Sequence, residues 1–455
     1  MDSVGSEANT TGPSETLTLL LRASGRRRGT LAGMSASLAL DLRARGLVHQ
    51  ITDPALEGLL DTTSLTAYIG FDPTADSLHL GNLLMLCNLR RLQEGGHRVI
   101  ALAGGGTGMI GDPGGRTEER SLLSREELEH NLGCIRGQLE RFVTVDGDRG
   151  LLLDNGDWLW STNLLEFLRD VGKHFTVNQM VAKDSVQTRF TSREQGISYT
   201  EFSYMLLQAF DFQQLFDRHG CTLQAGGSDQ WGNITMGVEL VRKRRGAQVF
   251  GLTSPLVTKA DGTKYGKSVG DALWLDADRT SPYDLWQFLF NSEDSKVMDY
   301  VRMFTWRGLD EIATLAEQTL SAPHNRVAQR VLANDVVAMV HGAAPAADSE
   351  RAAAVLFTPD VAGLDERSLA QAVASAPTAL LPDGGLTVAD AMVALGLAES
   401  GRDARRQVGQ GAVRVNGSAV DKGDPDRLLT TADALHGRYV LVRKGKRDQG
   451  VLRVG

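Results

Sequence analysis

The chain has 455 residues, with 48 Lys and Arg against 56 Asp and Glu and a formal net charge of −8. At about 100 to 200 residues per domain, this length predicts two to four domains. The negative charge argues against a protein that coats nucleic acid over its whole surface. The hydrophobic fraction of 42% is that of an ordinary globular protein. No apolar run approaches the roughly 18 residues that a membrane helix needs.

Cysteine usage and the N-terminal segment bear on the compartment. Cys87, Cys134 and Cys221 are scattered without a C-x-x-C pair, so neither a disulfide framework nor a cysteine zinc site is expected, and a reducing cytoplasm fits best. No protein-bound metal is predicted. Residues 1–33 are polar, and their three consecutive arginines follow a short apolar patch instead of preceding it, unlike a secretory signal. We expect residues 1–33 to be a disordered extension and Met34 to be a possible alternative start.

The first large region, residues 38–275, alternates short apolar runs with Gly-rich turns and helical stretches, which predicts a parallel α/β sheet. Residues 66–70 and 99–103 are typical of strands, and residues 83–93 between them of a helix. This is the pattern of a β-α-β unit. Residues 281–357 are mostly helical in pattern, with an amphipathic segment over 325–340.

The C-terminal part of the chain differs in charge from the rest. Pro and Gly residues over 377–385 predict a linker. Residues 387–455 contain 12 Lys and Arg and 8 Asp and Glu, so this part is +4 and the remainder is −12. Its predicted elements are helices over 388–395 and 402–409 and strands over 413–417 and 439–443. The basic charge suits phosphate contacts with folded RNA, although a solvated charged surface has the same composition.

A glycine run follows the second predicted strand and contains Gly106-Thr-Gly108-Met-Ile-Gly111, a literal G-x-G-x-x-G. On its own this pattern predicts a dinucleotide-binding dehydrogenase. However, Asp112-Pro113 comes directly after the third glycine, where the helix that receives the pyrophosphate should continue, and no strand ends in an acid about 20 residues on. A tight strand-to-loop turn is the simpler interpretation.

Two other elements are typical of phosphate binding. The segment around residues 68–82 predicts a strand, a turn and a helix whose first turn contains His79 and Asn82. Free N–H groups and a partial positive charge at a helix start favour a phosphate there. A later Gly-containing loop places Lys264 and Lys267 three residues apart. Alone, each element is equally typical of an ordinary helix cap or of a solvated basic loop.

A polar face is predicted on an otherwise apolar helix over residues 200–216. Tyr204, Gln208 and Asp211 are spaced four and three apart, so they share one side of that helix. Buried polar groups need hydrogen-bond partners. Either a bound ligand or other groups of the protein supply them.

Together these residues resemble the class I aminoacyl-tRNA synthetases. His79-Leu-Gly-Asn82 stands where that class has its HIGH motif, and Lys264-Tyr-Gly-Lys-Ser268 where it has KMSKS. Four further segments narrow the resemblance to the bacterial-type tyrosyl-tRNA synthetase family: residues 70–76, the glycine run through Asp112, residues 200–211 and residues 226–233. The resemblance covers nearly all of residues 36–455. Asn82 replaces the second His of HIGH and Tyr265-Gly266 replace Met-Ser, which leaves His79 and both lysines.

The resemblance implies a domain order. It comprises a Rossmann-like α/β catalytic domain over residues 34–275, a helical anticodon-arm-recognition domain over 276–376, a linker over 377–386 and a small α+β RNA-binding domain, like that of a ribosomal protein, over 387–455. Members of the family work as homodimers. The expected reaction activates L-tyrosine with ATP, accompanied by Mg²⁺, to tyrosyl-adenylate and pyrophosphate, and then transfers tyrosine to the 3′ end of its tRNA.

The resemblance also implies residue roles, because the family's functional positions match residues of this chain. The tyrosine-binding set is Tyr68, Asp72, Asp112, Tyr204, Gln208, Asp211 and Gln230. The catalytic set is His79, Thr74, Lys264, Lys267, Arg116 and Arg120. The ATP-binding set is His79, Asn82, Asp229, Lys267 and Ser268. The RNA-binding set is Arg405, Arg406, Asn416, Arg443, Lys444 and Lys446.

Two alternatives stay close to this family. Tryptophanyl-tRNA synthetase uses the nearest chemistry, but the pair Tyr68 and Asp211 and the basic C-terminal part disfavour it. An RNA-binding protein that has kept the fold and lost catalysis is opposed by His79, Lys264 and Lys267.

Overall fold

In a computed structural model of the chain, the structure describes residues 37–113, 123–183, 186–187, 196–266, 272–355, 359–373, 376–445 and 448–455. The expected extension over residues 1–33 and Met34 lie outside these ranges. The chain forms two compact units. Unit 1 comprises Met1–Asp72, Asn88–Arg125 and Leu139–Leu256, and unit 2 comprises Pro73–Cys87, Glu126–Gln138 and Val257–Gly455. None of the described helices combines the length and the apolar composition that a bilayer crossing requires.

Unit 1 is built on a six-stranded sheet with the order β1-β6-β5-β2-β3-β4. Only the edge strand β1 is antiparallel to its neighbour. The strands are β1 (Gln50–Ile51), β2 (Thr66–Phe71), β3 (Arg98–Ala103), β4 (Gly150–Asp154), β5 (Leu223–Gly227) and β6 (Phe250–Ser254). Central strands such as β3 are apolar and buried along nearly their whole length, as expected for a parallel sheet covered on both faces.

The strand order reverses between β2 and β5. From β2 the sheet continues to β3 and β4, whereas from β5 it continues to β6 on the other side. At such a switch point, ligands bind in the crevice outside the carboxyl ends of the strands. The predicted β-α-β unit is confirmed as β2, α4 (Leu80–Glu94) and β3.

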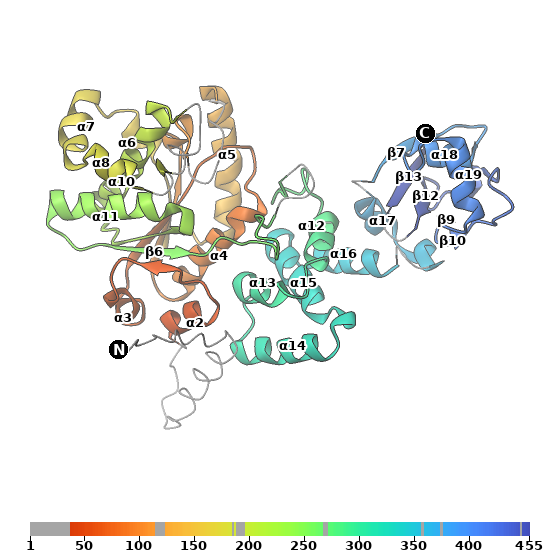
Figure 1. Cartoon of the computed structure of the whole chain (residues 1–455), viewed down its shortest axis with the longest axis horizontal. Helices are drawn as coiled ribbons and strands as arrows, with labels where there is room; N and C mark the ends of the chain where they lie inside the picture. Colours follow the sequence, from red (N-terminus) through yellow and green to blue (C-terminus); the bar gives the residue numbers. More distant parts are fainter. Residues whose placement is uncertain are drawn as a thin grey trace, which may run out of the picture. The chain divides into compact units, whose positions relative to one another are not determined.

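Helices cover this sheet, and α10 and α11 lie side by side (Figure 1). Ser198 accepts a hydrogen bond from the amide of Glu201 at the start of α10, and Gly220 ends the helix in the left-handed conformation. The helices of unit 1 are α2 (Leu38–Ala44), α3 (Ala55–Thr62), α6 (Gly156–Leu159), α7 (Leu164–Asp170), α8 (Val177–Val181), α10 (Tyr199–His219) and α11 (Trp231–Arg245), with the 3₁₀ turns η1 (Thr107–Met109), η2 (Gly172–His174) and η3 (Ser228–Gln230). Helix α5 (Arg125–Phe142) has its residues Glu126–Gln138 in unit 2.

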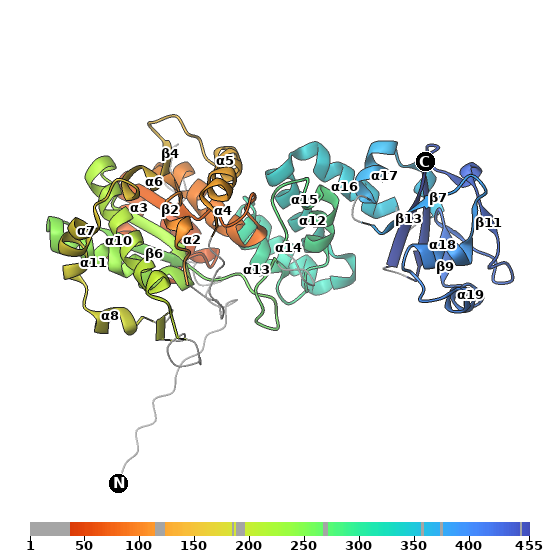
Figure 2. The ribbon, with the colours of Figure 1, turned by 90° about the horizontal axis from the view of Figure 1, so that it is seen from above.

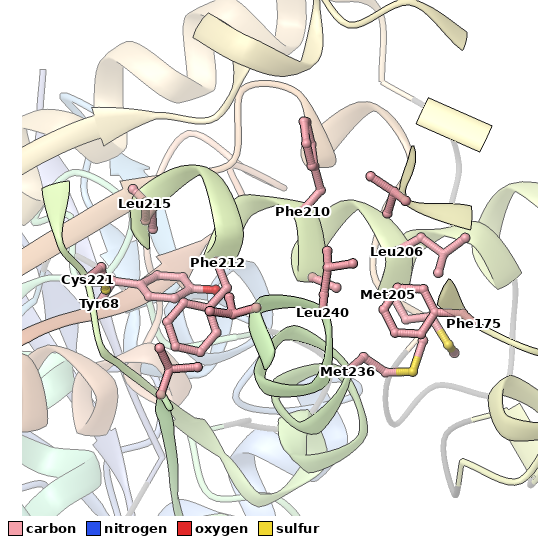
Figure 3. Close-up of a cluster of buried hydrophobic side chains, with 14 of the residues drawn as sticks. Tyr68, Phe175, Met205, Leu206, Phe210, Phe212, Leu215, Cys221, Met236 and Leu240 are labelled. Carbon is pink, nitrogen blue, oxygen red and sulfur yellow. The ribbon is translucent and has the colours of Figure 1, made fainter. Parts of the chain in front are cut away.

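A cluster of buried apolar side chains joins the sheet of unit 1 to α10 and α11 (Figure 3). The ring of Tyr68 on β2 lies beside that of Phe212 on α10, with 5.4 Å between ring centroids. Leu215 and Cys221 lie near the same ring (Figure 3). The whole Tyr68 side chain, including its hydroxyl, is therefore buried in the core.

The helical part of unit 2 confirms the pattern expected for residues 281–357. Ser281 caps α12 and Pro282 occupies its first turn. The elements are α12 (Pro282–Phe290), α13 (Val297–Phe304), α14 (Leu309–Ser321), η4 (Pro323–Asn325), α15 (Val327–His341), α16 (Ala343–Val355), η5 (Pro359–Gly363) and α17 (Glu366–Ala372).

The C-terminal part of unit 2 contains a five-stranded sheet in the order β10-β9-β12-β13-β7 and a two-stranded sheet of β11 and β8. Helices α18 and α19 pack against each other beside the larger sheet, at the blue end of the chain in Figure 2. The elements are β7 (Thr378–Leu381), β8 (Leu386–Thr387), α18 (Val388–Ala394), α19 (Gly401–Gly409), β9 (Val413–Val415), β10 (Ser418–Ala419), β11 (Leu428–Leu429), η6 (Thr431–Asp433), β12 (Tyr439–Lys444) and β13 (Asp448–Val454).

The segment expected as a linker, residues 377–386, differs from that expectation. Thr378–Leu381 is strand β7 and pairs in parallel with Val451–Val454 of β13. The prolines on either side of this short apolar run are consistent with an edge strand as well as with a linker. The class of fold predicted from the sequence, an α/β sheet followed by helices and a small α+β part, is confirmed.

Candidate functional site

Polar side chains collect beyond the carboxyl ends of the parallel strands in unit 1. Asp72 follows β2, Thr107 follows β3 and Asn155 follows β4. Hydrogen bonds connect them, because Thr107 Oγ1 donates to Asp72 Oδ1 at 2.8 Å and Asn155 Nδ2 donates to Thr107 Oγ1 at 2.8 Å. Helix α10 adds Tyr204, whose hydroxyl donates to Asp72 Oδ2 at 2.8 Å. One network thus runs along the edge of the sheet.

The glycine run allows these groups to approach the backbone closely. A Cβ atom on Gly104 would lie 2.1 Å from Asp72 Oδ1, and one on Gly105 would lie 2.2 Å from Asp154 Oδ1. The amide of Gly106 donates to Asn155 Oδ1 at 2.7 Å. Through Pro113 the described residues form only the short turn η1 and no α-helix. The run is therefore a tight turn, and the dinucleotide-binding interpretation of it is wrong.

Tyr68 and Asp211 form the most buried part of the site. The side chain of Tyr68 is 1% exposed, and its hydroxyl has no hydrogen-bond partner among the residues that the structure describes. Burial, followed by the nearby Asp211, raises the pKa of Tyr68 well above its usual value. Leaving a buried hydroxyl unpaired costs about 1–3 kcal/mol. The site therefore favours a ligand that offers a hydrogen-bonding group to this hydroxyl.

The carboxylate of Asp211 is held by two donors that the sequence reasoning missed. Asn155 Nδ2 and Trp158 Nε1 donate to it at 2.9 Å and 2.7 Å. Burial nevertheless raises the pKa of Asp211 to about 7, with Asp72 and Asp154 adding to the rise and the two hydrogen bonds opposing it. The available signal for Asn155 was its position directly after an apolar strand. A perturbed carboxyl group in a crevice is typical of a functional site.

A second group of polar side chains contains the other predicted tyrosine-binding residues. Gln230 Nε2 donates to Asp112 Oδ2, and Gln208 Nε2 donates to Gln230 Oε1 at 3.2 Å. Burial, then Asp72 and Asp112, raises the pKa of Tyr204 well above its usual value. Two carboxylates beside amide and hydroxyl groups are typical of a site for a cation such as an ammonium group.

All seven residues of the predicted tyrosine-binding set thus lie in unit 1. Hydrogen bonds join Tyr204, Asp72 and Asp211 through Thr107 and Asn155, and they join Asp112, Gln230 and Gln208 in the second group. Asp229 lies in η3 directly after β5 and is half-buried. The roles assigned to these residues stay predictions.

The H-x-G-N segment begins α4 in unit 2. Asn82 Oδ1 accepts the amide hydrogen of His79 at 3.1 Å, and the amide of Asn82 donates to His79 O at 2.8 Å. Asn82 therefore caps the helix, which explains why an amide suits this position. A Cβ atom on Gly81 would lie 2.8 Å from His79 Cε1, so the glycine leaves room for the imidazole over the first helical turn.

Residues 273–279 hold this helix start, a contact that the sequence did not predict. The amide of Leu80 donates to Leu273 O at 2.8 Å, and His79 pairs with Trp274 across an antiparallel bridge. The ring of Trp274 lies 6.2 Å from that of His79 and 3.5 Å from the guanidinium of Arg279. Thr74, in the turn between β2 and α4, is exposed.

The lysine loop is a hairpin that brings Lys264 to the same region of unit 2. Thr258 pairs with Lys264, and the amide of Tyr265 donates to Val257 O at 2.9 Å. A Cβ atom on Gly266 would lie 3.1 Å from Leu80 Cβ, so the end of the hairpin contacts the first turn of α4. The hairpin that carries Lys264 therefore contacts the helix start that carries His79. Lys267, Ser268, Arg116 and Arg120 lie outside the described residues.

The predicted RNA-binding residues lie on the basic C-terminal part. Arg405 and Arg406 are exposed on α19, and Arg443 on β12 lies directly opposite Arg414 on β9. Burial and Arg414 lower the pKa of Arg443. Like charges on directly opposite residues are unfavourable unless an anion compensates them, so Arg414 is a candidate that the sequence reasoning missed.

Described members of the RNA-binding set have partners within the protein, since Arg405 pairs with Asp426 at 2.9 Å and Arg406 with Asp403 at 2.5 Å. Lys444 Nζ donates to Leu397 O at 2.8 Å. Asn416 has a positive φ of 46°, and its side chain donates to Asp433 O at 2.6 Å and accepts from the amide of Leu441 at 2.9 Å. This geometry gives Asn416 a role in the turn after β9, and its contact with RNA stays a prediction. Lys446 lies outside the described residues.

Within the residues that the structure describes, no group of three or more His, Cys, Asp and Glu side chains could hold a metal ion. The three cysteines are free thiols.

Comparisons with known proteins agree on one family. The family of class I tRNA synthetases (W and Y) matches residues 60–358, and the tyrosine–tRNA ligase SYY-like C-terminal domain matches residues 368–451. A tyrosine–tRNA ligase of Roseiflexus castenholzii is 49% identical over 421 residues, which cover 91% of this chain and 98% of the relative. That of Geobacillus stearothermophilus is 45% identical over 420 residues, covering 91% and 99%.

Solved structures agree as well. A C-terminally truncated mitochondrial tyrosyl-tRNA synthetase of Aspergillus nidulans is 31% identical, with a TM-score of 0.64, and the match covers 76% of this chain and 99% of that chain.

The contact between Gly266 and α4 leads to a first prediction. Gly266 has a φ of 91° and the close contact with Leu80, whereas Gly262 in the same hairpin has a φ of 81° and open space within 4 Å of where a Cβ atom would lie. Both Gly→Ala variants carry a left-handed strain of about 1–3 kcal/mol. We expect Gly266→Ala to lower the thermal unfolding midpoint more than Gly262→Ala. Equal midpoints for the two variants would contradict a tight contact at Gly266.

Proposed function

The chain belongs to the tyrosine–tRNA ligases within the class I tRNA synthetases of tryptophan and tyrosine, and from this premise we propose how its residues carry out tyrosine–tRNA ligation. The reaction consumes ATP, forms tyrosyl-adenylate and pyrophosphate, and then transfers tyrosine to the 3′ end of the tRNA. The observation that supports tyrosine as the amino acid is the buried, unpartnered hydroxyl of Tyr68 near the carboxylate of Asp211.

We propose that the substrate's phenolic hydroxyl binds between Tyr68 and Asp211. It would donate to the carboxylate and accept from the Tyr68 hydroxyl, which satisfies both buried groups. The substrate's ammonium group would bind to Asp112, Tyr204 and Gln208. Asp72 and Gln230 would orient these groups, since they hydrogen-bond to Tyr204 and to Asp112 respectively. A phenylalanine side chain would leave the Tyr68 hydroxyl unpaired.

In the first step the carboxylate oxygen of tyrosine attacks the α-phosphorus of ATP. The bond between that phosphorus and the bridging oxygen breaks, and pyrophosphate leaves with its negative charge. No covalent enzyme intermediate is needed, so the residues act by positioning and by charge neutralisation. The proposed donors are His79, Thr74, Lys264, Lys267, Arg116 and Arg120. Asn82, Asp229 and Ser268 are proposed to bind ATP, Asp229 through the ribose, and Mg²⁺ to enter with ATP.

Tyrosine-dependent exchange between ATP and pyrophosphate tests this assignment. We expect exchange with L-tyrosine and little with L-phenylalanine or L-tryptophan. Lys264→Ala should lower the exchange rate by about 10²- to 10³-fold, as for loss of one donor to a developing charge, without changing the affinity for tyrosine. Lys296→Ala, which removes a lysine paired with Asp299, is the control. Exchange that depends on another amino acid, or full activity of Lys264→Ala, would refute the assignment.

The raised pKa of Asp211, about 7, leads to a prediction of pH dependence. The ionised carboxylate is the better acceptor for the phenolic hydrogen, so tyrosine binding favours loss of the proton from Asp211. The affinity for tyrosine should therefore rise from pH 6 to pH 8, by at most about tenfold per pH unit. Calorimetric titration without ATP measures it. L-Phenylalanine, which lacks the hydroxyl, is the control ligand and should show no such rise; a flat tyrosine profile would contradict the role of Asp211.

We propose the helical part, residues 276–376, as the domain that recognises the anticodon arm and residues 387–455 as a further RNA-binding domain. The facing pair Arg414 and Arg443 and the exposed Arg405 and Arg406 support contacts with RNA phosphates. Arg414→Ala should raise the KM for tRNA severalfold and reduce the salt slope of binding by about one, with exchange unchanged. Arg242→Ala, an exposed arginine paired with Glu239, serves as control. Unchanged tRNA binding would contradict the role of Arg414.

We also propose that the protein is a cytoplasmic homodimer. Six large exposed apolar residues of unit 1 fall within one stretch of the chain: Trp160, Leu164, Leu165, Leu168, Val177 and Tyr199. We propose that these residues form a contiguous apolar surface, which would favour a protein interface.

The dimer proposal predicts the effect of a charge in that stretch. Leu165, 74% exposed, should tolerate Glu in the monomer but not in the interface, so Leu165→Glu should give monomers in light scattering after size exclusion. Leu320→Glu, at a residue 84% exposed on α14, should leave the dimer intact. If Leu165→Glu remains a dimer, the interface lies elsewhere.

A further inference from the structure

The side chain of Tyr265, which stands where the class has the Met of KMSKS, is buried in an aromatic cluster of unit 2. Its ring is stacked on that of Tyr300 at 4.0 Å between centroids, and lies 5.0 Å from Phe288 and 6.5 Å from Phe304. Phe288 belongs to α12, and the other two belong to α13. The residue after Lys264 therefore packs into the helical part of the chain.

Two hydrogen bonds tie both arms of the hairpin to the same helices. The hydroxyls of Tyr265 and Ser292 lie 2.8 Å apart, and Ser292 follows the end of α12. The hydroxyl of Tyr300 donates to Thr258 O at 2.8 Å, and Thr258 pairs with Lys264. Arg326, before α15, donates to Ser292 O at 3.2 Å and so holds in place the residue that contacts the Tyr265 hydroxyl.

Burial along the hairpin is concentrated at its second arm. Residues 255–264 are exposed or half-buried, whereas Tyr265 is only 6% exposed. Segments with few buried side chains open easily, so the order of this hairpin depends strongly on the Tyr265 ring. In an extended segment neighbouring side chains point to opposite faces, which places the exposed Lys264 away from the cluster that holds Tyr265.

We propose that Tyr265 is a positioning residue that holds the Lys264 hairpin on α12 and α13, so that the helical part of the chain sets the position of this lysine during adenylate formation. The inference rests on the proposed role of Lys264. A rigid ring with a hydrogen-bonded hydroxyl fixes the hairpin more firmly than the flexible Met of the class motif would.

The test compares Tyr265→Ala with Tyr265→Phe, which keeps the ring and loses the bond to Ser292. For Tyr265→Ala we expect the exchange turnover per active enzyme to fall by about 10- to 100-fold, as for a misplaced catalytic group, while the Kd for tyrosine stays within about twofold. Active enzyme is counted by single-turnover adenylate formation. Tyr265→Phe should recover most of the lost turnover.

Ile312→Ala, on α14, is the control for a general loss of helical packing, because α14 supplies none of the ring or hydroxyl partners of Tyr265 described above. Its turnover per active enzyme should equal that of the wild type. An equal loss in Ile312→Ala, or full turnover in Tyr265→Ala, would overturn the proposal.

Hydrogen exchange separates this proposal from the proposed function. The amides of Tyr265 and Lys259 donate to Val257 O and Thr263 O within the hairpin. Both should exchange faster in Tyr265→Ala and at nearly the wild-type rate in Tyr265→Phe. If the wild type showed no tyrosine-dependent turnover, the proposed function would fail while the exchange data still decided the anchoring. Unchanged protection in Tyr265→Ala would refute the anchoring itself.

Discussion

The buried carboxylate of Asp211 is the constraint on which the arrangement of unit 1 depends. A carboxyl group this deep in the core needs donors, and Asn155 and Trp158 provide them from the segment after β4. Asn155 also donates to Thr107, which in turn donates to Asp72. The polar edge of the sheet is therefore one connected network, and a ligand bound at either end meets groups whose orientation is already set.

The same network explains why the backbone is so rich in glycine after β3. The carboxylates of Asp72, which follows β2, and of Asp154, on β4, lie where Gly104 and Gly105 pass, and any Cβ atom there would collide with them. The local pattern resembles a nucleotide-binding fingerprint because both need a backbone that other groups can approach closely. The side chains that surround the glycines, rather than the spacing of the glycines, distinguish a tight turn from a nucleotide-binding loop.

Sequence reasoning recovered most of the fold because β2, α4, β3 and α10 have clear local periodicity. The family motifs mark the seven residues of the predicted tyrosine-binding set, and all seven lie in unit 1, while their binding roles stay predictions. Sequence reasoning missed Asn155, Trp158 and Trp274, which act through contacts with residues far away in the sequence. Strand β7 was missed for the same reason, because its partner β13 lies near the end of the chain and a four-residue run has little periodicity of its own.

The parallel pairing of β7 with β13 adds residues before 387 to the sheet of the basic C-terminal part. Residues 378–381 precede the Gly-Gly turn, yet they complete the sheet that β12 and β13 form. A fragment that starts at residue 387 would present β13 as an open edge, with unpaired N–H and C=O groups available to another chain. The sheet of the basic C-terminal part therefore extends further along the chain than its helices and its basic charge suggest, because it includes Thr378–Leu381.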